Sequence, residues 1–392
     1  MPTTVYRDAA YTDARSAILE LGYSIHVTDG RIAWMGPTDA EPEPRDARII
    51  DAGGATIVPG MVDAHSHVTM PGGSHWIDRG FDDPAELERV AEENAQLALA
   101  SGVRWFRDVG SPQADVEGAP RALALTMRDR WAGDPTPRPY LRAAGTWISK
   151  AGTLPDGLAI DVDDADALRA AAIRQLDDGA DLLKLYLDGP DPDTAPWTVD
   201  EVASVVADAH ARGAKVTAHA TKLAGAAVCA AAGVDAIEHG FELDADVAAT
   251  MAANGTFLVA TLAVTSSWQS FGSTTTIERF TDPESRARIA ARRDSGMESV
   301  RLARAAGVPI AAGTDFGGGS LRANQLAWEI ESLVEAGLEP WEALAAATWR
   351  GGDLLGEPEA GRLHVSGPAD FFLVHGDPLS DPSALWRVWK VA

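Results

Sequence analysis

Short apolar runs alternate with Ala-rich amphipathic segments along the chain between residues 61 and 315. This rhythm is typical of parallel strands joined by crossover helices, with helix candidates such as 84–102 and 198–213 between the runs. Eight strand candidates follow one another, and they are MVDAHSH (61–67), VRWFRDV (103–109), PYLRAAG (139–145), DLLKLYL (181–187), KVTAHAT (215–221), VDAIEHG (234–240), TFLVATL (256–262) and VPIAAGTD (308–315). The pattern predicts an α/β fold, closed as a (β/α)8 TIM barrel.

A different pattern, short strands joined by turns, occupies both ends of the chain. Residues 24–37 alternate on either side of Asp29-Gly30, a pair that favours the tight turn of a hairpin. An acidic, proline-containing loop follows at residues 39–47. The C-terminal tail returns to strand composition, so we expect it to pair with the N-terminal strands. The sequence thus predicts a discontinuous β-sandwich domain, residues 1–58 and 359–392, and a catalytic barrel domain, residues 59–358.

The charge balance limits the partners that this chain can have. Its 58 acidic and 33 basic residues give a net charge of -25, which repels nucleic-acid phosphates and anionic lipid surfaces. With 46% hydrophobic residues, the chain can build a large core, but it has no run of about 18 apolar residues that could span a bilayer. The single cysteine, Cys229, cannot form an internal disulfide, and no signal peptide is recognisable. We therefore expect a cytoplasmic protein that binds neither nucleic acid nor membranes.

Two histidines stand two positions apart at the end of the first strand candidate, in VDAHSH. Because side chains alternate along a strand, Asp63, His65 and His67 share one side. The two imidazoles could bind a divalent ion, with Asp63 fixing one ring in the required tautomer. An H-x-H pair also occurs by chance on exposed strands, so the pair alone leaves both interpretations open.

Lys184 is flanked by leucines in the fourth strand candidate, where an unpaired ammonium group would face a large desolvation cost. One interpretation is an ion pair with an inward-facing carboxylate. The other is that burial lowers the lysine pKa, so that the free amine captures carbon dioxide and gives a carbamate able to bridge two metal ions.

Three further polar residues end their own strand candidates. His219 and His239 end the fifth and the sixth, and Asp315 ends the eighth. A buried histidine usually satisfies a backbone carbonyl, and an aspartate in this position can cap the following helix. In a parallel barrel, however, the carboxyl ends of all strands meet at one face, so these side chains would lie together there.

Together the six positions resemble the metal-ligand pattern of the amidohydrolase superfamily. That pattern is H-x-H on the first strand, lysine on the fourth, histidine on the fifth and sixth, and aspartate on the eighth, beside a β-domain closed here by GPADFFLVHGDPL. GMVDAHSH, GADLLKLY, DAIEHG and GTDFG are most similar to the branch of prolidase-like enzymes related to imidazolonepropionase. The likeness covers nearly the whole chain.

The resemblance implies a binuclear metal centre that hydrolyses an amide-type C–N bond. Its ligands would be His65 and His67 with Asp315 for one metal, His219 and His239 for the other, and carboxylated Lys184 between them. Two divalent ions, expected to be zinc, would share an attacking hydroxide, while Asp315 would be the proton shuttle. N-acyl amino acids or dipeptides are the expected substrates, and a carbamate, urea or lactam is the alternative.

Two other functions fit the sequence less well. A mononuclear deaminase would manage without the bridging lysine, so Lys184 counts against it. A catalytically inactive scaffold would be expected to have lost ligands, whereas all six positions are filled here. Because relatives are often multimers, we also expect a homo-oligomer that acts on a small-molecule substrate.

The chain departs from its prolidase-like relatives where they carry TGGH after the third strand, because it reads SKAGT at residues 149–153. The histidine of that motif contacts the substrate carbonyl, so the substrate cannot be carried over from the resemblance. Loop residues remain as candidates for substrate binding, with Lys150 or Arg322 able to hold a substrate carboxylate. The candidates are Trp76, Trp147, Lys150, Tyr186, Thr221 and Arg322, and His75, Trp197, Lys222 and Trp268 lie in the same predicted loops.

Overall fold

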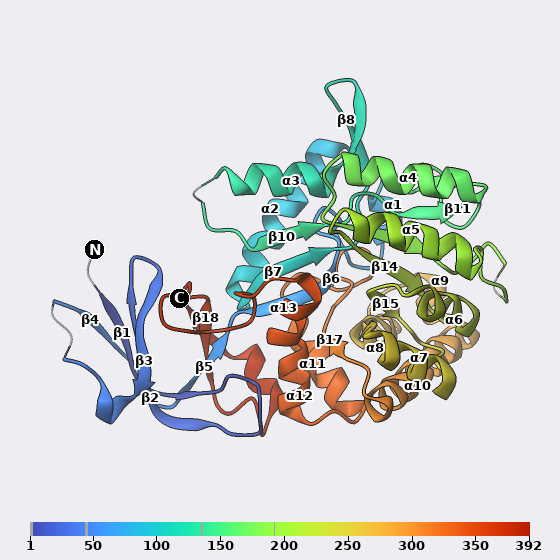
Figure 1. Ribbon diagram of the computed structural model, residues 1–392. Coiled ribbons are helices and arrows are strands. Elements are labelled where there is room, and N and C mark those ends of the chain that lie inside the picture. Colours follow the sequence, from blue (N-terminus) through green and yellow to red (C-terminus); the bar gives the residue numbers. More distant parts are fainter. Residues whose placement is uncertain (1–2, 44–45, 135, 192) are drawn as a thin grey trace.

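Eight parallel strands form the centre of the computed structural model, which describes residues 3–43, 46–134, 136–191 and 193–392 (Figure 1). Each of the eight predicted strand runs contains one of them, which confirms the predicted alternation. They are β6 (Met61–Ser66), β7 (Val103–Asp108), β10 (Tyr140–Ala143), β13 (Leu182–Tyr186), β14 (Lys215–Ala220), β15 (Ala236–His239), β16 (Phe257–Val259) and β17 (Ile310–Ala311).

Backbone hydrogen bonds close these strands into a barrel. Parallel pairing joins β6, β7 and β10 in one sheet and β13 through β17 in another. The amide of Asp181 donates to the carbonyl of Ala143 at 2.9 Å, which connects β10 to the start of β13. Two hydrogen bonds join β6 to β17 and the segment after it. The amide of Ala64 donates to the carbonyl of Ala312 at 2.9 Å, and the amide of Asp315 donates to the carbonyl of His65 at 2.8 Å. The predicted TIM barrel is thus confirmed.

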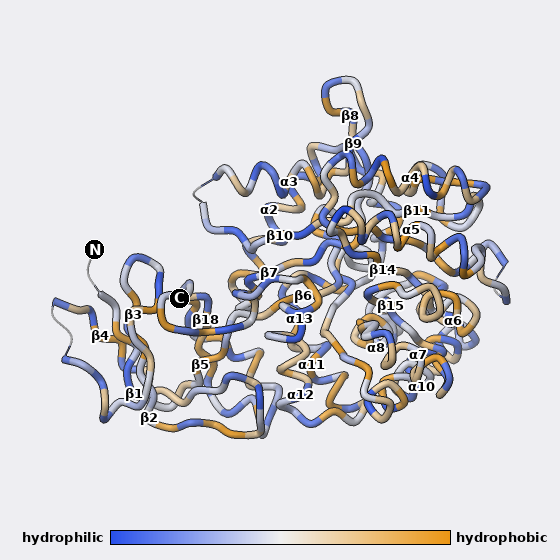
Figure 2. The backbone as a smooth tube through the Cα atoms, in the orientation of Figure 1, coloured by the Kyte–Doolittle hydropathy of each residue, from blue (hydrophilic) through white to orange (hydrophobic). Residues whose placement is uncertain are grey.

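Helices surround the barrel, and hydrophobic and hydrophilic residues mix along them as expected where one face packs on the strands (Figure 2). The two helices expected at 84–102 and 198–213 are confirmed as α2 and α5. The helices are α1 (Trp76–Arg79), α2 (Pro84–Ala100), α3 (Leu123–Ala132), α4 (Ala165–Asp177), α5 (Val199–Ala211), α6 (Leu223–Ala232), α7 (Ala245–Asn254), α8 (Leu262–Phe271), α9 (Glu278–Thr281), α10 (Pro283–Ala306), α11 (Leu326–Glu335), α12 (Pro340–Ala346) and α13 (Trp349–Leu355).

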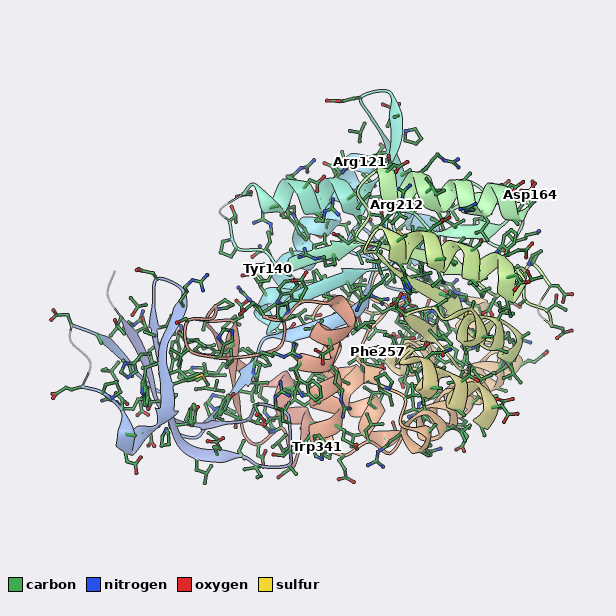
Figure 3. All side chains as sticks on the ribbon, viewed as in Figure 1. Arg121, Tyr140, Asp164, Arg212, Phe257 and Trp341 are labelled. Atoms are coloured by element: carbon green, nitrogen blue, oxygen red, sulfur yellow. The ribbon has the colours of Figure 1, made fainter. Side chains whose placement is uncertain are left out.

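Local sequence signals explain where these helices begin, and side-chain contacts join neighbouring helices. The side chain of Asp164 caps α4 by accepting a hydrogen bond from the amide of Ala167 at 2.8 Å. Arg212, just after α5, donates to Asp177 at the end of α4 at 2.6 Å. Asp164 and Arg212 lie on the helical outer layer in Figure 3, away from the barrel centre. In the described residues, no helix combines the length and apolar content that a bilayer span requires.

The terminal strands form one seven-stranded sheet beside the barrel, blue and red in Figure 1. Phe372 pairs with Val58 in antiparallel register, so the tail meets the N-terminal strands as predicted. Asp29 and Gly30, both with positive φ, form the predicted hairpin turn. The strands are β1 (Thr4–Tyr11), β2 (Glu20–Thr28), β3 (Arg31–Pro37), β4 (Arg48–Asp51), β5 (Ala55–Pro59), β18 (Phe371–His375) and β19 (Val388–Val391). The domain boundaries stay a prediction.

The remaining strands and 3-10 helices are short. Residues 44 and 45 of the predicted acidic loop lie outside the described residues, and the 3-10 helix Thr38–Ala40 occupies its start. A second 3-10 helix covers Pro382–Trp386. The additional strands are β8 (Gln113–Val116), β9 (Ala119–Ala122), β11 (Ile148–Lys150) and β12 (Ile160–Val162).

The sheet and the barrel are in close contact near β7. A Cβ atom on Gly102 would lie 2.5 Å from the ring of Phe372, so only glycine fits at this approach. Beside it, Arg104 forms an ion pair with Asp370 at 2.6 Å. These contacts lie at the amino-terminal side of β7, so the carboxyl ends of the barrel strands stay open for a site.

Candidate metal centre

A cavity of about 440 Å³ opens at the carboxyl ends of the barrel strands. All six residues of the predicted ligand set line it, although they come from five strands and the loops that follow them. We call them the candidate ligands, and they are His65, His67, Lys184, His219, His239 and Asp315. Ligand atoms of His65, His239 and Asp315 lie within 4.8 Å of one another, which is close enough to hold one metal ion.

The H-x-H pair faces Asp315 as a unit. Nε2 of His65 lies 3.4 Å and Nε2 of His67 lies 3.2 Å from Oδ1 of Asp315. On the far side of each ring, Nδ1 of His65 lies 2.5 Å from Oε2 of Glu238, and Nδ1 of His67 lies 2.7 Å from the carbonyl of Gly110. A carbonyl and a carboxylate can only accept, so each Nδ1 faces an acceptor, while each Nε2 faces Asp315 at the place where a metal ion could bind both the ring and the carboxylate.

His219 and His239 form a second pair, with ring centroids 4.5 Å apart. Nε2 of His219 contacts Oδ2 of Asp188 at 3.2 Å, and Nδ1 of His239 bonds Oγ1 of Thr261 at 2.8 Å. Burial lowers the pKa of both rings, and that of His239 well below its ordinary value. Among the described residues, neither histidine side chain contacts a backbone carbonyl, so the interpretation as carbonyl partners is wrong. Both rings are neutral at pH 7, the form in which imidazole binds metals.

Asp315 is an ionised carboxylate within this group. Burial would raise its pKa, but His65 and His67 outweigh that effect and hold the pKa well below its ordinary value. Its side chain does not cap a helix, because α11 begins only at Leu326 and has Gln325 at its cap. The capping interpretation is therefore wrong, and the carboxylate is available for chemistry in the cavity.

Unusual backbone conformations occur at the strand ends around the cavity. His239, Thr261 and Asp315 have φ values of 71°, 49° and 55°, a region that non-glycine residues rarely adopt. Such strain persists where the surroundings impose it, and it gathers at functional sites. At the end of β15, it lets the adjacent residues Glu238 and His239 both reach the centre, which simple strand alternation would forbid.

Lys184 lies at the base of the cavity with 1% of its surface exposed. Within the described ranges, no residue accepts a hydrogen bond from its amine or pairs with it within 4 Å, so the ion-pair interpretation is not supported. Burial lowers the pKa of Lys184 to about 8, although Glu238 and Asp315 oppose this effect. An appreciable fraction of the amine is therefore neutral near pH 7, and only a neutral amine reacts with carbon dioxide.

Glu238 is a functional residue that the sequence reasoning missed. Its carboxylate contacts Nδ1 of His65, accepts from Arg107 at 2.7 Å, and accepts a short hydrogen bond from Thr217. Burial would raise its pKa, but Arg107 and His65 outweigh this and lower it well below the ordinary value. A carboxylate directly before a histidine in the apolar run VDAIEHG was the signal that could have revealed it.

Asp63 was expected to hold a histidine ring and does not. It accepts hydrogen bonds from the amide and the hydroxyl of Thr314, at 3.0 and 2.6 Å, and from the backbone amide of His65 at 3.3 Å. The prediction fails because Asp63 lies one full strand repeat below His65, so its carboxylate reaches backbone of β6 and the segment after β17. It ties the two ends of the barrel sheet together beside Asp315.

Replacing Glu238 by glutamine should weaken metal binding about 10- to 100-fold. Glutamine offers one acceptor oxygen where the carboxylate serves both His65 and Arg107, so one of these donors would face an amide N–H. Metal affinity can be measured by competition with a coloured chelator. Glu329→Gln is the matched control, since Glu329 is fully buried and bonds the amide of Ala263 at 2.7 Å, away from the candidate ligands. Unchanged metal affinity in Glu238→Gln would contradict this role.

Asp188 was also missed, because it lies in a loop after β13 with no motif to mark it. Its carboxylate contacts His219 and accepts from the amide and the hydroxyl of Thr221, both at 2.7 Å. Burial would raise its pKa, but the hydrogen bond from His219 outweighs this and lowers it. Tyr186 stacks on the same ring with centroids 4.2 Å apart. His219 is thus fixed from two sides, with Nδ1 left free.

The predicted substrate-binding residues divide into two groups. Trp76, Trp147, Tyr186 and Thr221 line the cavity, as do Lys222 and Trp268. The residues that do not line it are Lys150, Arg322, His75 and Trp197.

The two cations expected to hold a carboxylate are occupied elsewhere. Nζ of Lys150 donates to the carbonyl of Asp163 at 2.6 Å and lies 4.4 Å from the ring centre of Trp197. The guanidinium of Arg322 donates a short hydrogen bond to the carbonyl of Pro71. Both side chains thus hold loops in place, and neither is available to a ligand in the cavity.

Comparison with known proteins shows what the chain as a whole is similar to. The model of the "Amidohydrolase family" matches residues 56–391. An uncharacterized protein of Mycobacterium bovis is 31% identical over 370 residues, which cover 93% of this chain and 89% of that protein. The imidazolonepropionase of Salinispora tropica is 28% identical over 407 residues, covering 95% and 87%. Among solved structures, a Xaa-Pro dipeptidase with methionine bound in its active site has a TM-score of 0.84 at 25% identity, covering 99% of this chain and 98% of that one.

Proposed function

Because the chain belongs to the amidohydrolase family and is a hydrolase of carbon–nitrogen bonds, we propose that it cleaves the amide bond of N-acyl amino acids or dipeptides. The observation that carries this proposal is the state of the four cavity histidines. Each has one ring nitrogen held from behind by an acceptor or a hydroxyl, which leaves the other nitrogen for a metal.

The donor set suits two divalent ions, with zinc as the expected metal. Neutral imidazole nitrogens and carboxylate oxygens are the ligands that zinc prefers, and both kinds meet here. His65 and His67 with Asp315 would hold one ion, and His219 would hold the other together with His239, whose ligand atom also lies within 4.8 Å of those of His65 and Asp315. The amine of Lys184, buried and unpaired within the described residues, would react with carbon dioxide, lose a proton and become the carbamate between them.

Two bound ions would polarise the scissile carbonyl and lower the pKa of water toward 7. Asp315 would accept the proton of the attacking water and return it to the leaving nitrogen as the C–N bond breaks. The products are a carboxylic acid and an amine, so the atoms balance without any other reactant. An ionised carboxylate beside the histidines is suited to this task, and such proton transfer typically contributes about 10² to 10⁴ in rate.

The substrate class is supported by the lining of the cavity. Apolar and aromatic side chains dominate the wall, including Met70, Trp147, Leu158 and Phe241. A site of this kind holds the apolar part of a small substrate while a few polar groups orient it. Carbamates, ureas and lactams remain the alternative substrates, because the same attack would open any of their carbonyls. The cytoplasmic location and a homo-oligomeric state stay predictions.

A substrate screen with metal analysis tests the proposal. Protein reconstituted with zinc should contain about two metal ions per chain and hydrolyse N-acyl amino acids or dipeptides. Turnover confined to carbamates, ureas or lactams would favour the alternative. One metal per chain with release of ammonia would favour a deaminase. No metal and no turnover would leave only an inactive scaffold and contradict the proposal.

A further inference from the structure

Besides the four histidines, three lysine and arginine side chains line the cavity among the described residues, and they differ in what they already bind. Lys184 lies buried at the base among the candidate ligands. Lys222 forms an ion pair with Glu242 at 2.6 Å. Arg292 has no ion pair and no hydrogen bond to any residue in the described ranges. Arg292 is therefore the cation of the cavity wall that remains available to a ligand.

Arg292 belongs to α10, and the helix holds it over the cavity. One turn further along the helix, Oγ of Ser295 donates to the carbonyl of Phe241 at 2.6 Å. A Cβ atom on Gly296 would lie 2.9 Å from the ring of Phe241, so the absence of a side chain lets α10 come this close. Residues three and four apart share a helix face, so Arg292 projects from the face that packs on Phe241, itself part of the cavity wall.

The charge of the surroundings makes this position selective for an anion. The two carboxylates that line the cavity are Asp188 and Asp315, and within the described residues neither pairs with Arg292. Both are already engaged by histidines. A carboxylate entering the cavity is thus favoured beside Arg292, whose planar guanidinium can bind it through two parallel hydrogen bonds.

The apolar walls indicate how the rest of such a ligand would lie. One wall is a cluster of Met70, Trp147 and Leu158, next to His67. Trp268 of α8 also lines the cavity, and α10 is bound to α8 where Arg293 donates to Ser266 at 3.2 Å. A ligand with its carboxylate at Arg292 and its scissile amide at the candidate ligands would therefore find apolar side chains in the same cavity for its acyl group.

From this arrangement we propose that Arg292 binds the carboxylate of the substrate and so sets its specificity. The substrate would be an N-acyl amino acid or dipeptide with a free α-carboxylate on the amine side of the scissile bond and an apolar acyl group. This inference rests on the proposed function and deepens it. It also replaces the expectation that Lys150 or Arg322 would hold the carboxylate.

The test compares two substrates that differ only in the carboxylate. N-acetylphenylalanine and N-acetyl-2-phenylethylamine contain the same scissile amide, with and without that group. We expect the zinc-loaded enzyme to prefer the acid, and Arg292→Gln to reduce the ratio of the two kcat/KM values about 10- to 100-fold, mainly through KM for the acid. Arg292→Lys should restore part of the ratio. Arg301→Gln is the matched control, since Arg301 lies on the same helix, does not line the cavity, and forms an ion pair with the exposed Glu298.

A binding measurement separates this inference from the proposed function. In the zinc-loaded Asp315→Asn background, calorimetric titration with N-acetylphenylalanine should show binding that weakens about 10- to 100-fold when Arg292→Gln is added. Hydrolysis of neutral amides, ureas or carbamates without any preference for an acid would overturn the role of Arg292 and leave C–N bond hydrolysis intact. Binding of N-acetylphenylalanine that depends on Arg292, without hydrolysis of any amide, would support the role of Arg292 and contradict the proposed function. If Asp315→Asn binds N-acetylphenylalanine equally well with and without Arg292→Gln, the inference is overturned.

Discussion

Replacing Lys184 by alanine should reduce kcat by on the order of 10³-fold and lower the metal content of the protein. The side chain is buried at the base of the cavity, and its carbamate would supply the anion that offsets two adjacent dications. Without that anion, repulsion between the two ions would release at least one of them. The measurements are metal analysis after gel filtration and steady-state kinetics with the best substrate from the screen.

Three observations would separate this explanation from a simple loss of packing. Formate or acetate added to Lys184→Ala should enter the space left by the side chain and restore part of the activity and the second metal. Protein incubated with ¹³C-labelled bicarbonate should show a carbamate carbon signal that Lys184→Ala lacks. Lys150→Ala, a lysine substitution outside the cavity, is the matched control. Full activity with both metals retained in Lys184→Ala would contradict the proposed centre.

Replacing Asp315 by asparagine should reduce kcat by about 10²- to 10⁴-fold with a smaller change in KM. Asparagine has nearly the same shape and keeps one oxygen facing His65 and His67, but it cannot accept the proton of the attacking water. Substrate binding depends on the cavity walls, so it should survive. Kinetics and metal analysis of the purified variant provide the measurement.

The leaving group offers a sharper test of the role of Asp315. A p-nitroanilide leaves without much help from an acid, whereas an alkyl amine must be protonated as the C–N bond breaks. The loss caused by Asp315→Asn should therefore be smaller for the anilide than for the alkyl amide. Equal losses for both substrates, together with loss of metal, would mean that Asp315 acts only as a ligand.

The ligand set could be found in the sequence because the fold repeats a simple rule. Each strand of a parallel barrel ends at the same face, so a polar residue at the end of an apolar run is directed to that face. His65, His219, His239 and Asp315 all obey this rule and line one cavity. The (β/α)8 order, the paired terminal strands and the hairpin at Asp29-Gly30 follow from equally local patterns.

The residues that hold the cavity histidines in place, Glu238 and Asp188, could not be found by this rule. Alternation assigns Glu238 and His239 to opposite sides of β15, and only the positive φ of His239 brings both to the centre. Asp188 lies in an irregular loop, so no period marks its contact with His219. Asp63 was predicted to hold a histidine ring, a role that Glu238 has in the structure. The sequence indicates which side of the strand Asp63 faces, but not how far along the barrel axis its carboxylate lies.

What the sequence determined by itself is the order of strands and helices and the chemistry at the strand ends, since hydrophobic periodicity and residue type are local properties. The tertiary structure alone decided which cations remain free. Lys150, Arg322 and Lys222 find partners from distant segments, whereas Arg292, in the middle of a long helix with no motif, has none among the described residues. The physical reason is that the availability of a charge depends on the distances between elements, which packing sets and local sequence does not encode.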